Sequence, residues 1–452
     1  MSAEESRRSR DPFGAVGSAG GVSLYVHVPF CASRCAYCDF FSIPLPGRPP
    51  GQGPRPAGAD GMLADPVGEF LAASRMDGFL GEVLQDVPTL YVGGGTPTVL
   101  GERLVELLSE TCAHVGLRPG AEITVEANPD SLTPALAEAL AAAGVSRVSL
   151  GVQSFDDDVL AALGRRHDAR RAEEAAAAVA GSGLRLSVDL MCGVPRQSAS
   201  GWRESLERAL DSGAGHVSVY PLSVEPGSAL AESVRRGELR EPDQDSTAGM
   251  MLAAEEVLGE GGLVRYEVAN YSLPGEESRH NLRYWTGGEY AGVGPRAHSM
   301  MSPATLARVG VLGELALERL GVDADDGGRV RLMADASLEE FVRERWDGRP
   351  AEVEYLAPGD AAREDVMLGL RLAEGVTDAL VELAGADVRA ALERLEAAGL
   401  VERWASEAGA PASDAQRTEP PGTKRASRWR TTRRGWLLGN EVFGAVWNAR
   451  GA

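Results

Sequence analysis

The chain is poor in cysteine and has no long apolar run. Only 5 of its 452 residues are cysteine, too few for the disulfide framework of a small secreted domain. No stretch of about 18 or more apolar residues occurs, which argues against a transmembrane helix. The first residues, MSAEESRRSRDPFGAVGSAGG, lack the apolar core of a secretory signal. We therefore expect a protein of the reducing cytoplasm.

Positive charge is also scarce. The 66 acidic and 45 basic residues give a formal net charge of -21. Such a surface repels phosphate backbones, so a nucleic-acid partner is not expected. One basic cluster stands out near the C-terminus: Lys424, Arg425, Arg428, Arg430, Arg433 and Arg434. It could contact an anionic membrane surface or an acidic partner, but we favour a solvated linker.

The pattern of short apolar runs indicates the fold class. At about 100–200 residues per domain, this length predicts two or three domains. Runs rich in β-branched residues alternate with Ala-, Leu- and Glu-rich helical patterns, which is typical of a parallel sheet covered on both faces. The expected strands are 22–28, 89–94, 122–127, 146–152, 185–191 and 216–222. Six such units predict an α/β fold with a partial barrel, whose chemistry lies at the C-terminal ends of the strands.

Three segments of biased composition divide the chain. Residues 1–20 are expected to be disordered, and Pro- and Gly-rich residues 44–61 and 406–427 are expected to be flexible insertions. We expect a core domain at 21–300 and a mostly helical, winged-helix-like domain at 301–452. Its helices are expected at 338–346, 362–376 and 387–404, followed by a turn, a strand and a helix within 433–443.

The clearest motif is CASRCAYC, which places Cys31, Cys35 and Cys38 on one loop after an apolar strand. Three thiolates can bind three irons of a four-iron cube, and the open fourth iron can chelate the amino and carboxylate groups of S-adenosylmethionine (SAM). The alternative is a structural zinc site with His27 or Asp39 as fourth ligand. Such sites usually use two paired motifs, and the sequence has no second pair.

Polar residues follow several other expected strands. In GGGTPT (93–98), the glycine N–H groups and the Thr96 hydroxyl could hold a carboxylate or an amine, although such a triplet is more often a turn. Glu126, Gln153 and Asp189 stand near three strand ends. They could point into the barrel mouth or simply cap the strands. Arg165 would by default be a surface charge.

Taken together, SLYVHVPFCASRCAYCDF, YVGGGTPT, VEANPD, SLGVQSF, DLMCGVP and VEPGS resemble one radical SAM family. This family contains oxygen-independent coproporphyrinogen III oxidase and the heme chaperone HemW. The resemblance spans about residues 21 to 445 and implies a partial (β/α)6 barrel capped by a C-terminal domain. It implies [4Fe–4S] ligation by Cys31, Cys35 and Cys38, and SAM contacts by Tyr25, Tyr37, Gly94, Gly95, Thr96, Glu126, Gln153, Arg165 and Asp189. Some of these positions serve a second SAM in the oxidase, so the resemblance implies contact with a single SAM less directly for Tyr37, Gln153, Arg165 and Asp189 than for the others.

Three features favour the heme chaperone subgroup over the oxidase. Phe40 stands where the oxidase resemblance requires a further cysteine, and the N-terminal extension is short. HNLRYW resembles the H-N-x-x-Y-W signature of the chaperones. There His280 could supply an imidazole to heme iron, and Tyr284 and Trp285 could stack on the macrocycle. Alternatively, His280 is a polar loop residue, and Tyr284 and Trp285 pack the barrel edge. His298, in GVGPRAHS, is a second candidate for heme contact.

The resemblance therefore implies a cytoplasmic heme chaperone that binds a [4Fe–4S] cluster, SAM and heme. Its partners would be heme-accepting proteins and an electron donor for the cluster. The alternative is the oxidase, which decarboxylates coproporphyrinogen III. A third class, a cluster-dependent radical enzyme acting on an unrelated substrate, remains compatible with a barrel alone. Whether the chain is an enzyme is left open.

Overall fold

The computed structural model describes residues 20–45, 63, 65–74, 83–241, 243–334, 337–344, 350, 352–405 and 427–449. The segments expected to be disordered or flexible, 1–20, 44–61 and 406–427, lie almost entirely outside the described residues. Among the described helices, none is long and apolar enough to cross a membrane.

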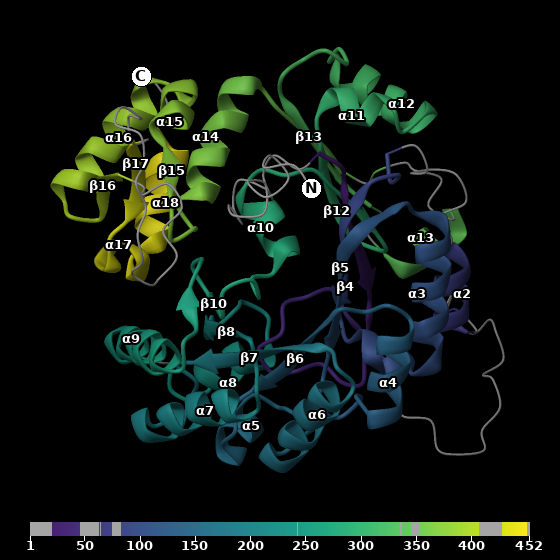
Figure 1. Cartoon of the computed structure of the whole chain (residues 1–452), viewed down its shortest axis with the longest axis vertical. Coiled ribbons are helices and arrows are strands. Elements are labelled where there is room, and N and C mark those ends of the chain that lie inside the picture. Colours follow the sequence, from purple (N-terminus) through teal and green to yellow (C-terminus); the bar gives the residue numbers. More distant parts are fainter. Residues whose placement is uncertain are drawn as a thin grey trace, which may run out of the picture.

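A twelve-stranded open sheet forms the centre of the molecule (Figure 1), with the order β14-β13-β12-β11-β1-β4-β5-β6-β7-β8-β10-β9. All six strands expected from the sequence are present as parallel neighbours. They are β1 (Ser23–Val28), β4 (Val87–Gly94), β5 (Leu117–Ala127), β6 (Arg147–Gln153), β7 (Arg185–Cys192) and β8 (His216–Pro221). The expected partial (β/α)6 barrel is confirmed.

Helices cover the outer face of these strands, as Figure 1 shows for α3, α4, α6 and α7. The helical segments from α2 to α9 are α2 (Pro66–Ala73), the 3-10 helix η1 (Pro97–Leu100), α3 (Glu102–His114), α4 (Pro134–Ala142), α5 (Asp157–Ala162), α6 (Ala169–Gly181), α7 (Ala199–Asp211), α8 (Ala229–Arg235) and α9 (Gln244–Glu260). Several begin at a side chain that caps the helix, such as Thr133 before α4 and Asp168 before α6, which satisfies backbone N–H groups at the helix start.

Alternation along each strand separates the core from the cavity. In β6, Val148, Leu150 and Val152 are fully buried, and they belong to the main hydrophobic core. The alternate residues of this strand, Arg147, Ser149, Gly151 and Gln153, line the cavity inside the barrel. The two-residue period of a strand therefore places polar side chains inside and apolar ones under the helices.

The sheet continues beyond the six expected strands. β11 (Tyr290–Val293) lies parallel to β1, and β12 (His298–Met301), β13 (Arg329–Met333) and β14 (Glu352–Leu356) follow as antiparallel strands. The remaining elements of this part are β2 (Phe30–Cys31), β3 (Ile43–Pro44), β9 (Val264–Arg265), β10 (Asn270–Ser272), α10 (Arg279–Trp285), α11 (Pro303–Ala307), α12 (Val311–Leu320) and α13 (Leu338–Glu344). The main core extends to Phe341. The boundary that we expected at residue 300 therefore does not coincide with a break in the core, because β12 spans this position and β13 and β14 follow it in the same sheet.

A second core begins at Ala362 and belongs to the C-terminal domain, at the upper left of Figure 1. This domain contains α14 (Pro358–Gly369), β15 (Val376–Thr377), α15 (Asp378–Ala384), α16 (Ala386–Ala397), β16 (Val401–Ala405), β17 (Ser427–Thr431), α17 (Arg433–Leu437) and α18 (Gly439–Trp447). Helices surround a three-stranded antiparallel sheet, which agrees with the expected mostly helical domain.

Two local expectations for this domain were wrong. Residues 433–443 contain two helical segments and no strand, because the strand lies earlier, in β17. The described part of the basic cluster is folded structure and not a linker. The Arg430 guanidinium donates to Glu402 at 2.8 Å, and Arg433 pairs with Glu255 at 2.8 Å. Lys424 and Arg425 lie outside the described residues.

Candidate functional site

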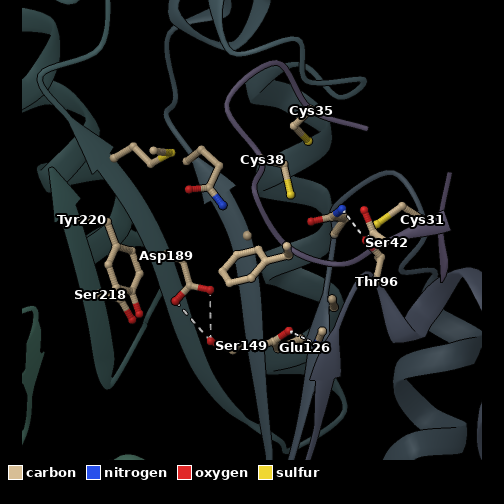
Figure 2. Close-up of a pocket in the computed structure, with 18 of the residues that line it drawn as sticks. Cys31, Cys35, Cys38, Ser42, Thr96, Glu126, Ser149, Asp189, Ser218 and Tyr220 are labelled. Carbon is tan, nitrogen blue, oxygen red and sulfur yellow. Dashed lines mark hydrogen bonds between the residues drawn. The ribbon is translucent and has the colours of Figure 1, made fainter. Parts of the chain in front are cut away.

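A cavity of about 570 Å³ lies at the C-terminal ends of the parallel strands, beneath the cysteine loop. Figure 2 shows the three cysteine side chains at one end and Glu126, Ser149 and Asp189 toward the other. The cavity is lined by almost every residue that the sequence singled out for the cluster and SAM: Cys31, Cys35, Cys38, Tyr37, Gly94, Gly95, Thr96, Glu126, Gln153, Arg165 and Asp189. Residues from six separate segments thus converge on one space.

The three thiols share this cavity as free cysteines. The Cys31 Sγ lies 3.5 Å from the Thr96 hydroxyl, and the Arg165 guanidinium donates to the Cys35 Sγ at 3.3 Å. Burial raises the pKa of the Cys31 and Cys38 thiols, so iron binding must displace their protons. Thiolates are the ligands of iron–sulfur clusters, so the donor set and its shared opening fit a [4Fe–4S] cluster.

The zinc alternative requires four ligands around a single point. His27, one suggested fourth ligand, uses both ring nitrogens elsewhere: Nδ1 is hydrogen-bonded to the Tyr25 hydroxyl at 3.0 Å and Nε2 to the Phe41 carbonyl at 3.1 Å. In the described part of the chain, no three His, Cys, Asp or Glu side chains are grouped closely enough for one metal ion. A four-iron cluster does not require such close grouping, because each of the three cysteines binds a different iron atom.

The glycine triplet is required by close packing. A Cβ on Gly93 would lie 2.7 Å from the Glu126 carboxylate, and one on Gly95 would lie 2.5 Å from the Phe30 carbonyl oxygen. The N–H groups of this segment, which the sequence offered as possible ligand donors, instead donate hydrogen bonds within the protein. Gly94 donates to Glu126 at 3.0 Å, Gly95 to the Val28 carbonyl at 2.8 Å, and Thr96 to the Phe30 carbonyl. This occurs because the segment folds back against the end of β1.

Two partly buried carboxylates, Glu126 and Asp189, line the cavity. Glu126 accepts hydrogen bonds from the Tyr91 hydroxyl at 2.8 Å and from the Gly94 N–H, and burial raises its pKa. Asp189 accepts from the Ser149 hydroxyl at 3.1 Å. Its pKa is raised to about 7 by burial and by the nearby charge of Glu126. A cationic ligand would lower the pKa of both carboxyl groups. SAM is such a ligand, because it carries a sulfonium and an ammonium group.

Replacing Asp189 with asparagine is expected to stabilise the SAM-free protein at alkaline pH. The folded state holds a proton that the unfolded state releases, because the pKa is about 7 when folded and 3.8 otherwise. The free energy of unfolding of the wild type therefore falls as pH rises through this window. The free energy of unfolding of Asp189→Asn should therefore exceed that of the wild type by up to roughly 4 kcal/mol at pH 8, and the two should be similar near pH 4. Urea unfolding at both pH values tests this, and an equal difference at both would contradict it.

Gln153, Arg165 and Tyr37 complete the wall near the cysteines. Gln153 has a positive φ of 67°, at an irregularity in the pairing of β6 with β7. Such bulges reorient side chains at functional sites. Arg165 is not the surface charge expected by default: its guanidinium donates to the Asn128 side chain and the Gly151 carbonyl, both at 2.7 Å. Burial raises the pKa of Tyr37, which keeps the phenol protonated.

The remaining candidates lie apart from this cavity. Tyr25 lines a neighbouring one, with Tyr284. His280 belongs to helix α10, not to a loop, and this helix contacts both β4 of the barrel and α14 of the C-terminal domain. Its exposure is 1%. Nδ1 is hydrogen-bonded to the Thr89 hydroxyl at 2.8 Å and Nε2 to the Tyr284 hydroxyl at 3.0 Å. Trp285 packs against Leu282 and a small apolar cluster.

Sequence reasoning missed several cavity residues. Asn128 donates to the Thr96 hydroxyl at 2.9 Å and holds Arg165 in place. Ser149 donates to Asp189, and Tyr220 also lines the cavity (Figure 2). Asn128 stands in the quoted VEANPD segment, and Ser149 lies at an inward position, two residues before Gly151. The period of the strand could have identified Ser149, but the partners of Asn128 depend on distant segments.

Comparisons with known proteins agree with this architecture. Residues 25–209 match the model of the radical SAM superfamily. The heme chaperone HemW of Mycobacterium tuberculosis is 41% identical over 318 residues, which cover 67% of this chain and 78% of that protein. The heme chaperone HemW of Synechocystis sp. is 33% identical over 358 residues, or 79% of each chain.

Among solved structures, coproporphyrinogen III oxidase (HemN) from Escherichia coli, a radical SAM enzyme, is similar over 99% of this chain and 93% of that one. The TM-score is 0.69 and the sequence identity is 18%, so this likeness shows a shared fold. The identity to the HemW proteins is higher and spans more than two thirds of the Mycobacterium tuberculosis chain. The chain therefore belongs to the heme chaperone HemW family within the radical SAM superfamily.

Proposed function

We propose that this chain is a cytoplasmic heme chaperone that holds a [4Fe–4S] cluster, binds SAM beside it and delivers heme to acceptor proteins. One observation carries the proposal: three cysteines of one loop and two partly buried carboxylates line a single cavity in a chain 41% identical to a HemW protein. The proposal requires heme-accepting proteins and an electron donor for the cluster as partners.

The cavity residues have distinct roles in this proposal. Cys31, Cys35 and Cys38 would hold three irons of the cluster, and SAM bound beside it would supply a sulfonium that a reduced cluster could reduce. Glu126 and Asp189 attract the positive charges of SAM. The Arg165 guanidinium donates to the Cys35 sulfur and stabilises the negative charge that ligation places there.

The oxidase alternative has weaker support. Phe40 replaces the additional cysteine of the oxidase, and its ring, 68% exposed, lines the cavity wall without offering a sulfur ligand. The oxidase likeness rests on 18% identity, whereas the HemW relatives described above are 33% and 41% identical. We therefore retain the chaperone as the function and the oxidase as the outcome that would overturn it.

A paired assay on the anaerobically reconstituted protein tests the function. Hemin is expected to bind stoichiometrically and to move to an apo-acceptor such as apomyoglobin when the two are mixed. Coproporphyrinogen III, supplied with SAM and a reductant, is expected to remain unchanged, as measured by chromatography of the oxidised porphyrins. Formation of protoporphyrinogen IX would instead assign the oxidase activity, and a chain that binds no hemin would exclude the chaperone.

A further inference from the structure

We propose that heme binds in a second cavity beside the cysteine loop, with His298 as the imidazole ligand of the iron and Arg296 as the partner of a propionate. This inference rests on the proposed function and names its cargo site. The cavity has a volume of about 520 Å³, within the usual range of about 300–1,000 Å³ for ligand pockets. Aromatic side chains make up much of its wall: Phe40, Phe41, Tyr284 and Tyr290.

These aromatic rings suit a flat macrocycle. Tyr284 and Tyr290 pack edge to face, with centroids 4.7 Å apart. Phe40 projects into solvent and lines both this cavity and the cluster cavity. The end of the cysteine loop therefore lines both the cluster cavity and the second cavity. Such amphipathic and apolar rings bury a porphyrin face efficiently.

His298 is the imidazole of this cavity that can bind iron without losing a hydrogen bond. It stands on β12 directly opposite Met333 of β13, so both side chains lie on one face of the sheet. The His298 side chain is exposed, and its ring nitrogens have no hydrogen-bond partner among the residues described. His27, in the same cavity, has both nitrogens engaged. Burial lowers the pKa of His298, which favours the neutral ring that ligates metals.

Arg296 supplies the charge that a heme propionate needs. It has a positive φ of 60°, and its guanidinium lies 5.7 Å from the centroid of the Phe41 ring. The side chain is exposed and has no ion pair within the described ranges. Asp39 also lines the cavity. The charge of Glu352 on β14 raises the pKa of His298, and the charge of Arg331 on β13 lowers it. Arg296 is thus a cation at the rim that is free to pair with a carboxylate.

The same geometry gives the HNLRYW motif a different role from iron ligation. His280 is buried outside both cavities and is hydrogen-bonded to the Tyr284 hydroxyl. Its pKa is lowered to about 3 by burial, so the neutral ring is held between Thr89 and Tyr284. Tyr284 in turn lines the heme cavity. We therefore assign His280 as a positioning residue for Tyr284.

Substitution of the two histidines separates ligation from positioning. The full-length protein is titrated with hemin while the cluster is kept in its oxidised, EPR-silent state. His298→Ala is expected to lose the EPR and visible signature of imidazole-ligated ferric iron and to weaken hemin binding roughly tenfold or more. Added free imidazole should restore that signature. His280→Ala should retain the signature even if the affinity falls.

The outcomes distinguish this inference from the proposed function. If His298→Ala keeps the signature and His280→Ala loses it, the cargo site lies at α10 and the inference fails, although the chaperone function stands. If the wild type binds no hemin, the proposed function itself fails. Because His298 is exposed, its replacement should leave the circular dichroism spectrum and the iron content of the cluster unchanged, which checks that the variant is folded.

A second arm tests Arg296 with two forms of the ligand. Arg296→Gln is expected to weaken the binding of hemin several-fold but to leave the binding of hemin dimethyl ester unchanged, because the ester has no carboxylate. Arg240→Gln, at another exposed arginine, controls for the loss of one surface charge and should change neither affinity. Equal weakening of both ligands by Arg296→Gln would contradict the propionate contact.

Discussion

Serine in place of Cys31, Cys35 or Cys38 is expected to abolish stable cluster binding. Three thiolates hold three irons of the cube, and a hydroxyl is a poor substitute for a thiolate at iron. The wild type should contain about four iron and four sulfide per chain after anaerobic reconstitution, and each variant should lose most of both. SAM binding, measured by equilibrium dialysis, should weaken in parallel, because the open iron that chelates its amino and carboxylate groups is then missing.

Cys112→Ser is the matched control for this loss. Cys112 lies on α3 and does not line the cavity, and its partly buried side chain packs against the main core. It should keep the iron and sulfide content of the wild type. A colourless wild type that binds zinc, or a cluster that survives replacement of all three cysteines of the loop, would contradict the assignment.

Trp429→Ala is expected to destabilise the C-terminal domain by about 3–5 kcal/mol, the usual cost of removing a large buried aromatic side chain. Trp429 is fully buried in β17 and belongs to the second core. Its indole N–H donates to Asp378 at 2.7 Å, and the Arg403 guanidinium lies 4.2 Å from its ring centroid. The substitution therefore removes packing, a hydrogen bond and a cation–π contact together.

Denaturant unfolding should show this loss as an earlier transition of the C-terminal domain. Limited proteolysis would locate the transition, while absorbance of the cluster reports on the barrel. Leu383→Ala, on α15 of the same domain, is the control: the side chain is 72% exposed, so a change within about 0.5 kcal/mol is expected. If the barrel and its cluster are lost at the same denaturant concentration, the two cores unfold as one unit.

Contacts between the two domains could make their cores unfold as one unit. The Trp436 indole N–H donates to the Val268 carbonyl at 2.8 Å, and the Arg265 guanidinium lies 4.4 Å from the Trp436 ring. Arg433 pairs with Glu255 of α9. These contacts link α17 to the edge of the barrel. The experiment therefore measures how strongly this surface couples the two domains.

The barrel could be predicted because its signals are local. Each parallel strand is a short run of β-branched residues, buried on both faces, between helical patterns, and the six expected ranges match β1 and β4–β8 closely. The position of Glu126 and Asp189 near strand ends also made them candidates for the cavity, which they line. Patterns were less informative near residue 300 and beyond it, where β12, β13 and β14 extend the same sheet. Those strands are defined by antiparallel pairing with distant partners, which no local period records.

The sequence alone determined the cysteine loop, the order of the βα units and the polar strand ends, because spacing and two-residue alternation act within a few residues of one another. Only the tertiary structure decided what those side chains contact. In the folded chain, N–H groups of the glycine triplet donate to other protein groups, and Arg165 donates to Cys35. His280 is hydrogen-bonded to Thr89 and Tyr284, and His298 lines an aromatic cavity. Each of these outcomes depends on hydrogen bonds or packing between segments far apart in the chain, whose approach is fixed by the closing of the sheet and not by local sequence.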